Sequence, residues 1–121
     1  MDIEKKACML LKSLIFHYHG LDDEEEQMLK EAAQKLDAYD ELIWSNNFIA
    51  EDYLSAFERS RDFLKKIIGN MPLDKKLDQL YSVWEDNNVK GYLTEMETSA
   101  MLKLAKDWNI NEELMQRVKQ N

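Results

Sequence analysis

The sequence predicts an all-α protein, folded as a compact bundle of six or seven helices. Apolar residues recur at helical spacing along most of the chain. Glycine and proline are scarce, at 3 and 1 of 121 residues, and the abundant leucine, lysine, glutamate and alanine favour helix. A chain of this length buries about two-thirds of its unfolded surface and needs no disulfide or metal to fold. We therefore expect residues 1–121 to form a single domain.

The first two helices are predicted from Asp2 to Tyr18 and from Asp23 to Leu36. Apolar residues surround the first helix almost completely, which is typical of a helix in the middle of a bundle. The second helix has a narrower apolar stripe and a strongly charged outer face. We therefore expect it to lie at the surface.

The middle of the chain is predicted to form a short helix and then a long one. The stretch from Asp37 to Asn47 begins with a capping residue type and ends in turn formers, which indicates a short helix. Phe48 to Ile68 keeps its apolar residues in register and is expected to be one long helix. Gly69, Asn70 and Pro72 then end it, because glycine favours a helix C-cap and proline cannot continue the hydrogen bonding.

Three further helices are predicted after this stop. Apolar residues from Leu73 to Trp84 share one helix face, which ends near Asn88, and another helix runs from about Glu95 to Trp108. The last helix has a short apolar face and a polar terminus, so it is expected to dock loosely. That face consists of Leu114, Met115 and Val118.

Two of the predicted loops copy each other. In each, a glycine ends a helix, a leucine follows, and an Asp or Thr caps the next helix while a Glu closes a capping box. The first copy contains Gly20, Leu21, Asp22 and Glu25, and the second contains Gly91, Leu93, Thr94 and Glu97. The apolar stripes behind them also match, with Met28, Leu29, Ala32, Ala33 and Leu36 answering to Ala100, Met101, Leu104, Ala105 and Trp108. The sequence thus predicts a quasi-duplicated helix-loop-helix unit.

The chain is acidic, with a net charge of -8 and a pI near 4.8. Nucleic-acid binding needs clustered lysine and arginine to neutralise phosphates, so no nucleic-acid partner is expected. The same charge permits a basic protein partner or a divalent cation, and it is also typical of ordinary solubility.

Cysteine usage and the N-terminal residues indicate a cytoplasmic protein. Cys8 is the only cysteine, which excludes an internal disulfide and a cysteine-based zinc site and fits a reducing compartment. Lys12 and Ser13 interrupt the first apolar run. We therefore expect neither a signal peptide nor a membrane span.

Catalytic patterns are weak, so the protein is predicted not to be an enzyme. Cys8 has no histidine at helical spacing, and no serine lies in a nucleophile-elbow pattern. Three glycines do not make a phosphate-binding loop. No cofactor is expected beyond a weakly bound divalent metal.

Metal-ligand residue types crowd in one place, where His17 and His19 precede the acidic run Asp22, Asp23, Glu24, Glu25 and Glu26. Helix dipoles alone produce such a composition, because imidazoles favour a helix C-terminus and acids the next helix N-terminus. A weak site remains the alternative, since carboxylates and an imidazole can hold a divalent ion. Its candidate ligands are His19, Asp22, Glu25 and, if the two units face each other, Glu97.

The acidic run and one tryptophan are the candidate partner-binding residues. Aromatic residues are enriched at interface cores, but most aromatics here fall on helical stripes and are expected to pack in the core. Trp44 is the exception, because it is predicted to lie in a short irregular region before Ser45, Asn46 and Asn47.

At the two copied loops the chain resembles the TerB-like family, named for a tellurite-resistance protein. The matching residues are Gly20, Leu21, Asp22 and Glu25 in the first copy and Gly91, Leu93, Thr94 and Glu97 in the second. The resemblance implies an all-helical bacterial bundle with a stress-response or scaffolding role and, in some members, an acidic metal-associated surface. The leading hypothesis is a non-enzymatic cytoplasmic interaction module that binds a basic protein through Asp22 to Glu26. The alternative is a metal-responsive binding protein.

Overall fold

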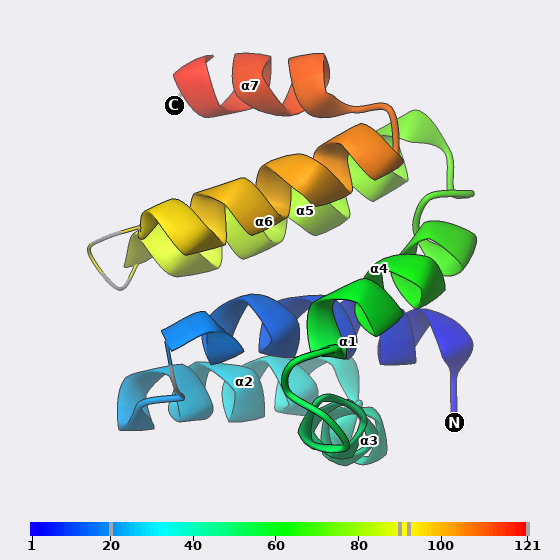
Figure 1. The fold of residues 1–121 in the computed structure, drawn as a ribbon, viewed down its shortest axis with the longest axis vertical. Coiled ribbons are helices and arrows are strands. Elements are labelled where there is room, and N and C mark those ends of the chain that lie inside the picture. Colours follow the sequence, from blue (N-terminus) through cyan, green and yellow to red (C-terminus); the bar gives the residue numbers. More distant parts are fainter. Residues whose placement is uncertain (20, 90, 92, 121) are drawn as a thin grey trace.

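The computed structural model describes residues 1–121 except 20, 90, 92 and 121, and describes only the backbone of His19. Within these residues the chain forms seven α-helices and one 3-10 turn and contains no strand (Figure 1). This confirms the prediction of an all-α bundle. The elements are α1 (Ile3–Phe16), η1 (His17–His19), α2 (Asp23–Leu36), α3 (Tyr39–Ala50), α4 (Ala56–Ile67), α5 (Leu73–Val89), α6 (Glu95–Asp107) and α7 (Asn111–Gln120).

Helix α1 is the centre of the bundle, as its apolar circumference predicts. It contacts α2, α3, α4, α5 and α6, and in Figure 1 it runs between α2 on one side and α5 and α6 on the other. Helix α2 packs against α1 and α3, which confirms its surface position. Helix α7 docks on α5 and α6 and buries a single residue, Leu114.

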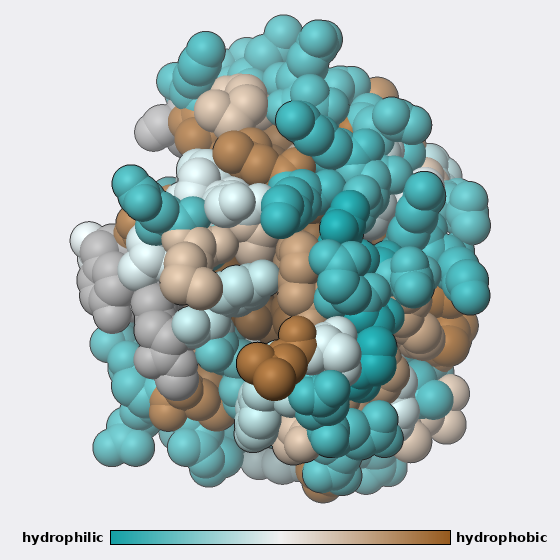
Figure 2. All heavy atoms as spheres, in the orientation of Figure 1, coloured by the Kyte–Doolittle hydropathy of each residue, from teal (hydrophilic) through white to brown (hydrophobic). Residues whose placement is uncertain are grey.

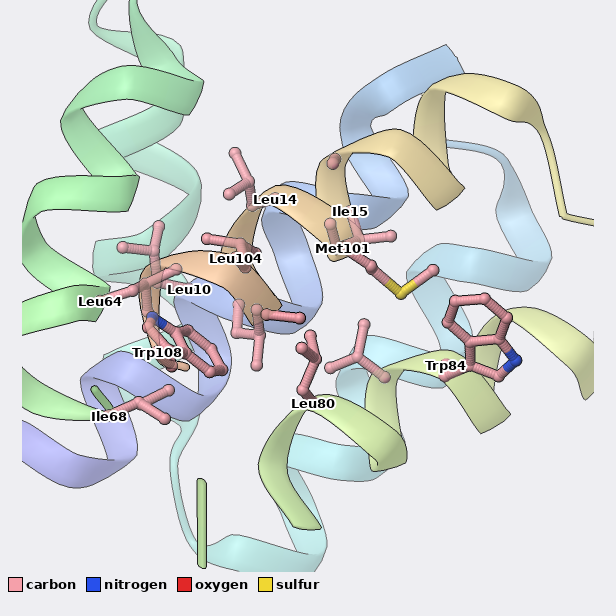
Figure 3. Close-up of a cluster of buried hydrophobic side chains, with 14 of the residues drawn as sticks. Leu10, Leu14, Ile15, Leu64, Ile68, Leu80, Trp84, Met101, Leu104 and Trp108 are labelled. Atoms are coloured by element: carbon pink, nitrogen blue, oxygen red, sulfur yellow. The ribbon is translucent and has the colours of Figure 1, made fainter. Parts of the chain in front are cut away.

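Opposite faces of α1 belong to two separate cores. The larger core joins α1 to α4, α5, α6 and α7 and includes Ile49 of α3, and Figure 3 shows Leu10 and Leu64 close to Trp108 within it. The smaller core lies between α1, α2 and α3. It consists of Met9, Phe16, Leu29, Ala33, Ala38 and Leu42. A helix that serves two cores must be apolar nearly all round, which explains the composition of α1.

The single long helix predicted from Phe48 to Ile68 is wrong. Helix α3 continues through the two asparagines to Ala50, and a loop over residues 51–55 separates it from α4. In this loop Asp52 Oδ1 accepts a hydrogen bond from Leu54 N at 3.1 Å, a local bond that competes with helix. The Arg59 guanidinium also donates to Phe48 O at 2.8 Å and to Asp52 O at 2.9 Å, which satisfies one carbonyl in the last turn of α3 and one in the loop.

The predicted stop after Ile68 is confirmed. Ile68 is the C-cap of α4, and Gly69 N donates to Leu64 O at 3.1 Å. A Cβ atom at Gly69 would lie 2.4 Å from Lys65 O, so only glycine lets the chain turn this closely against the last helical carbonyls. The first helix ends slightly earlier than predicted, at Phe16, because residues 17–19 wind into a 3-10 turn.

Both predicted capping boxes are present, and the two units also end alike. Asp22 and Thr94 begin α2 and α6, each bonded reciprocally to the Glu three residues later. Each unit then exits through a left-handed residue, Asp37 (φ 52°) or Asn109 (φ 59°). Asp37 therefore ends α2 and does not cap α3, which begins without a side-chain cap. Gly20 lies outside the described residues.

The described helices are too short or too polar to cross a membrane. Even α5, at 17 residues, is interrupted by charged side chains along its length.

Candidate functional site

The acidic run at the start of α2 is only partly available to a partner. Asp22, Asp23, Glu24 and Glu26 are exposed, but Glu25 is 1 % exposed. Glu25 N donates to Asp22 Oδ1 at 2.8 Å, and Glu25 Oε1 accepts from Asp22 N at 3.2 Å. The carboxylate of Glu25 is thus held in the capping box and offers almost no surface to a partner.

The metal-ligand candidates are divided between the two capping boxes. Asp22 and Glu25 meet in the first box, whereas Glu97 is fully buried in the second, where its Oε1 accepts from Thr94 N at 3.2 Å. Helix α1 lies between α2 and α6 in Figure 1. The side chain of His19 lies outside the described residues. Among the side chains that are described, no three His, Cys, Asp or Glu residues converge on a position that could hold a metal ion.

Trp44 lies in the middle of α3 and not in an irregular region, because the helix continues through the two asparagines that follow. Its half-buried ring packs against Phe48 and Phe63, with ring centroids 5.2 and 5.3 Å apart. Lys6 Nζ lies over the same ring, 4.8 Å from its centroid. These contacts tie α3 to α4 and α1, so Trp44 has a packing role in this structure.

A groove that sequence reasoning missed opens between α2 and α5, with α1 as its floor. Its volume is about 450 Å³. The α2 wall is mainly apolar and is formed by Met28, Leu29, Ala32 and Leu36, with Glu31 and Lys35 at the rim. The α5 wall is polar and is formed by Asp78, Gln79, Ser82 and Asp86. The floor consists of Cys8, Lys12 and Phe16.

Three polar groups of the groove, on Lys12, Ser82 and Asp86, are paired with one another. Lys12 Nζ lies 2.7 Å from Asp86 Oδ2 and donates to Ser82 Oγ at 3.1 Å. Burial raises the pKa of the Cys8 thiol; the Lys12 charge opposes this shift and the Asp86 charge adds to it. The thiol is therefore protonated at neutral pH and is a poor nucleophile. An apolar wall facing a polar wall is suited to binding an amphipathic segment.

A comparison of the two copied units shows which part of α2 is left open at the groove. The α2 stripe of Met28, Ala32 and Leu36 corresponds to Ala100, Leu104 and Trp108 of the second unit. Leu36 is 41 % exposed, whereas its counterpart Trp108 is 1 % exposed. Helix α6 packs against α1, α4, α5 and α7, and Figure 3 shows Leu104 and Trp108 near side chains of α1 and α4. No helix of the described chain covers the α2 stripe in the same way. The sequence did contain one sign of this groove, because the matched apolar stripe lies on a helix that was expected at the surface.

Comparisons with known protein families, with curated proteins and with solved structures find no match for this chain.

Proposed function

We propose that the protein is a non-enzymatic interaction module that binds an amphipathic helix of a partner protein in the groove between α2 and α5. The half-open apolar stripe of α2 is the observation that supports this proposal. The equivalent stripe of α6 is covered by helices of the same chain. A helix is therefore the element whose shape and apolar face fit the uncovered copy, as in other helix-in-groove complexes.

Charge selects the kind of partner. Asp23, Glu24 and Glu26 are exposed at the start of α2, and Glu31 lies at the groove rim. Glu24 precedes Met28 by one helical turn, so it continues the line of the groove. With a net charge of -8, the protein attracts basic segments and repels acidic ones. The partner helix is therefore basic as well as amphipathic.

The wider hypothesis, a cytoplasmic, TerB-like scaffolding or stress-response module, stays a proposal that rests on the sequence. The family resemblance rests on the two copied loops, and these loops form the two capping boxes. A non-enzymatic role fits the groove, because Lys12 and Asp86 bind each other and burial keeps the Cys8 thiol protonated.

Titration with a synthetic helical leucine-lysine peptide tests this proposal. Amide chemical shifts of the isotope-labelled protein are expected to change along α2 and α5. Leu36→Ser is expected to weaken binding about tenfold, because about 1.4 kcal/mol of apolar burial is lost. Ile43→Ser is the matched control, since Ile43 is an exposed aliphatic residue on α3 outside the groove. Shift changes confined to other helices, or equal effects of the two variants, would contradict the proposal.

A further inference from the structure

A second surface, distinct from the groove, combines an apolar projection with adjoining hollows. We call it the loop strip and define it by Tyr18, Tyr53, Leu54, Phe57 and Met96. Leu54 is 98 % exposed and Met96 is 59 % exposed. Figure 2 shows a strongly hydrophobic projection over the connection between α3 and α4. Such concentrated apolar exposure is typical of a binding surface.

The loop that carries Leu54 is held in place by hydrogen bonds. Arg59 donates to Phe48 O and Asp52 O, and its Nε donates to Ser55 Oγ at 2.9 Å. Leu54 N donates to Asp52 Oδ1. The leucine is therefore presented outward on a preorganised backbone, and binding it costs little conformational entropy.

Two hollows lie beside this projection. One, of about 320 Å³, is lined by Leu54 itself together with His17 and Phe57. The next, of about 360 Å³, has an apolar lining of Tyr18, Phe57, Met96 and Ala100 and a polar lining of Glu95, Ser99 and Lys103. The rings of Tyr18 and Phe57 meet edge to face, with centroids 5.8 Å apart, and separate the two hollows. The second hollow has room for a leucine side chain, which would pack against its apolar side.

The ends of the loop strip differ in charge, with two carboxylates at the loop end and, at the α6 end, two lysines beside the single carboxylate of Glu95. Glu51 and Asp52 are exposed at the loop end, and Glu51 makes only a 3.6 Å contact with Arg59. Lys103 and Lys106 are exposed at the α6 end, and neither forms an ion pair within the described part of the chain. The strip is therefore complementary to itself when one copy is turned end to end against another.

We propose that the loop strip binds a second copy of this chain about a two-fold axis. Leu54 of each copy enters the hollow beside Tyr18, Phe57 and Met96 of the other. Glu51 of each copy faces Lys103 of the other, as an isologous interface requires. These local contacts oppose the repulsion between two chains of charge -8, which is screened beyond about 8 Å at physiological ionic strength. The interface uses a different face from the groove and so extends the proposed function.

Sedimentation equilibrium of the full chain from about 1 μM to about 1 mM covers the affinities expected of a small interface. A monomer–dimer equilibrium is expected. Leu54→Asp is expected to raise the dimer dissociation constant by at least about tenfold. The exposed side chain of Leu54 supports no core packing, so this variant folds. Leu73→Asp is the matched control, because Leu73 is half-exposed on α5 outside the strip.

Exchanging the charges of Glu51 and Lys103 tests whether these two residues face each other across the dimer interface. Glu51→Lys and Lys103→Glu should each weaken the homodimer, because each places like charges opposite one another twice. An equimolar mixture of the two variants should regain the dimer, since both contacts are then between opposite charges. A monomer at every concentration, a dimer insensitive to Leu54→Asp, or a mixture that stays monomeric would overturn the proposal. The proposal would also be overturned if the loop strip bound an unrelated protein and never a second copy of this chain.

Discussion

The two helix-loop-helix units of this protein have the same local geometry. Asp22 and Thr94 each accept a bond from the Glu backbone nitrogen three residues on, at 2.8 and 3.2 Å. At the other end, Ala38 N donates to Ala33 O at 2.8 Å and Ile110 N donates to Ala105 O at 2.9 Å. Every one of these residues in the second unit lies 72 positions after its counterpart, as Thr94 follows Asp22.

The surroundings of the two units differ. Helix α2 buries Glu25, Leu29 and Ala33, whereas α6 buries Glu97, Ala100, Met101, Leu104 and Ala105. Among the described residues, helix α6 packs against α1, α4, α5 and α7, whereas α2 packs against α1 and α3. The comparison shows that capping and helix termination depend on a few adjacent residues, while burial depends on which distant helices pack against the stripe. The proposed binding groove arises from this second factor.

Truncating the last residue of each apolar stripe should give the largest difference between the two units in lost folding stability. Trp108→Ala should lower the free energy of unfolding by about 3–5 kcal/mol, because it empties a fully buried site. Leu36→Ala should cost less than about 1 kcal/mol, since its side chain is already 41 % exposed. Urea denaturation monitored by circular dichroism measures both values. Similar losses of stability for the two variants would contradict the difference in burial between Leu36 and Trp108, and with it the open groove.

Removing the caps should affect the two units equally. Thr94→Ala and Asp22→Ala should each destabilise the domain by about 1 kcal/mol, because each removes one acceptor for an unpaired helix N–H. Another acid beside Asp22 can replace part of its role, in which case the first loss is smaller. The urea midpoint is the measurement. An unchanged midpoint for Thr94→Ala would refute the capping-box account of the second loop.

The smallest expected effect is on the rate at which Cys8, on the floor of the groove, is alkylated. Because the thiol pKa is raised, less thiolate is present at any pH below it, so iodoacetamide should react more slowly than with a free cysteine peptide. The rate should keep increasing at pH values where the peptide rate has levelled off. A bound leucine-lysine peptide should slow it further, and urea should restore the ordinary rate. Peptide-bound protein that reacts as fast as free protein would place the peptide outside the groove.

Sequence reasoning located most helix boundaries, because apolar period and capping residues act within a few positions. The start of α2 at Asp23, the start of α6 at Glu95 and the stop after Ile68 were all predictable on this basis. The break between α3 and α4 was not, since one of the contacts that hold it comes from Arg59, which reaches back 11 residues to Phe48 O. The asparagines before that break resembled a turn but continue the helix.

The candidate site was less predictable than the fold. The acidic residues were recognisable from composition, but the burial of Glu25 in its capping box changes which of them can meet a partner. Trp44 was expected in an irregular region and instead packs between helices. The groove joins α1, α2 and α5, whose contributing residues range from Cys8 to Asp86, and no local pattern reports such a distant combination.

The sequence by itself determined the helical class, the central position of α1 and the two matched capping boxes, because these follow from spacing and from hydrogen bonds between near neighbours. Only the tertiary structure decided that α4 and α1 cover the stripe of α6 while the stripe of α2 stays half open. The reason is that hydrophobic burial is not directional. Either of two matched stripes can be covered, and the path of the remaining chain decides which one is.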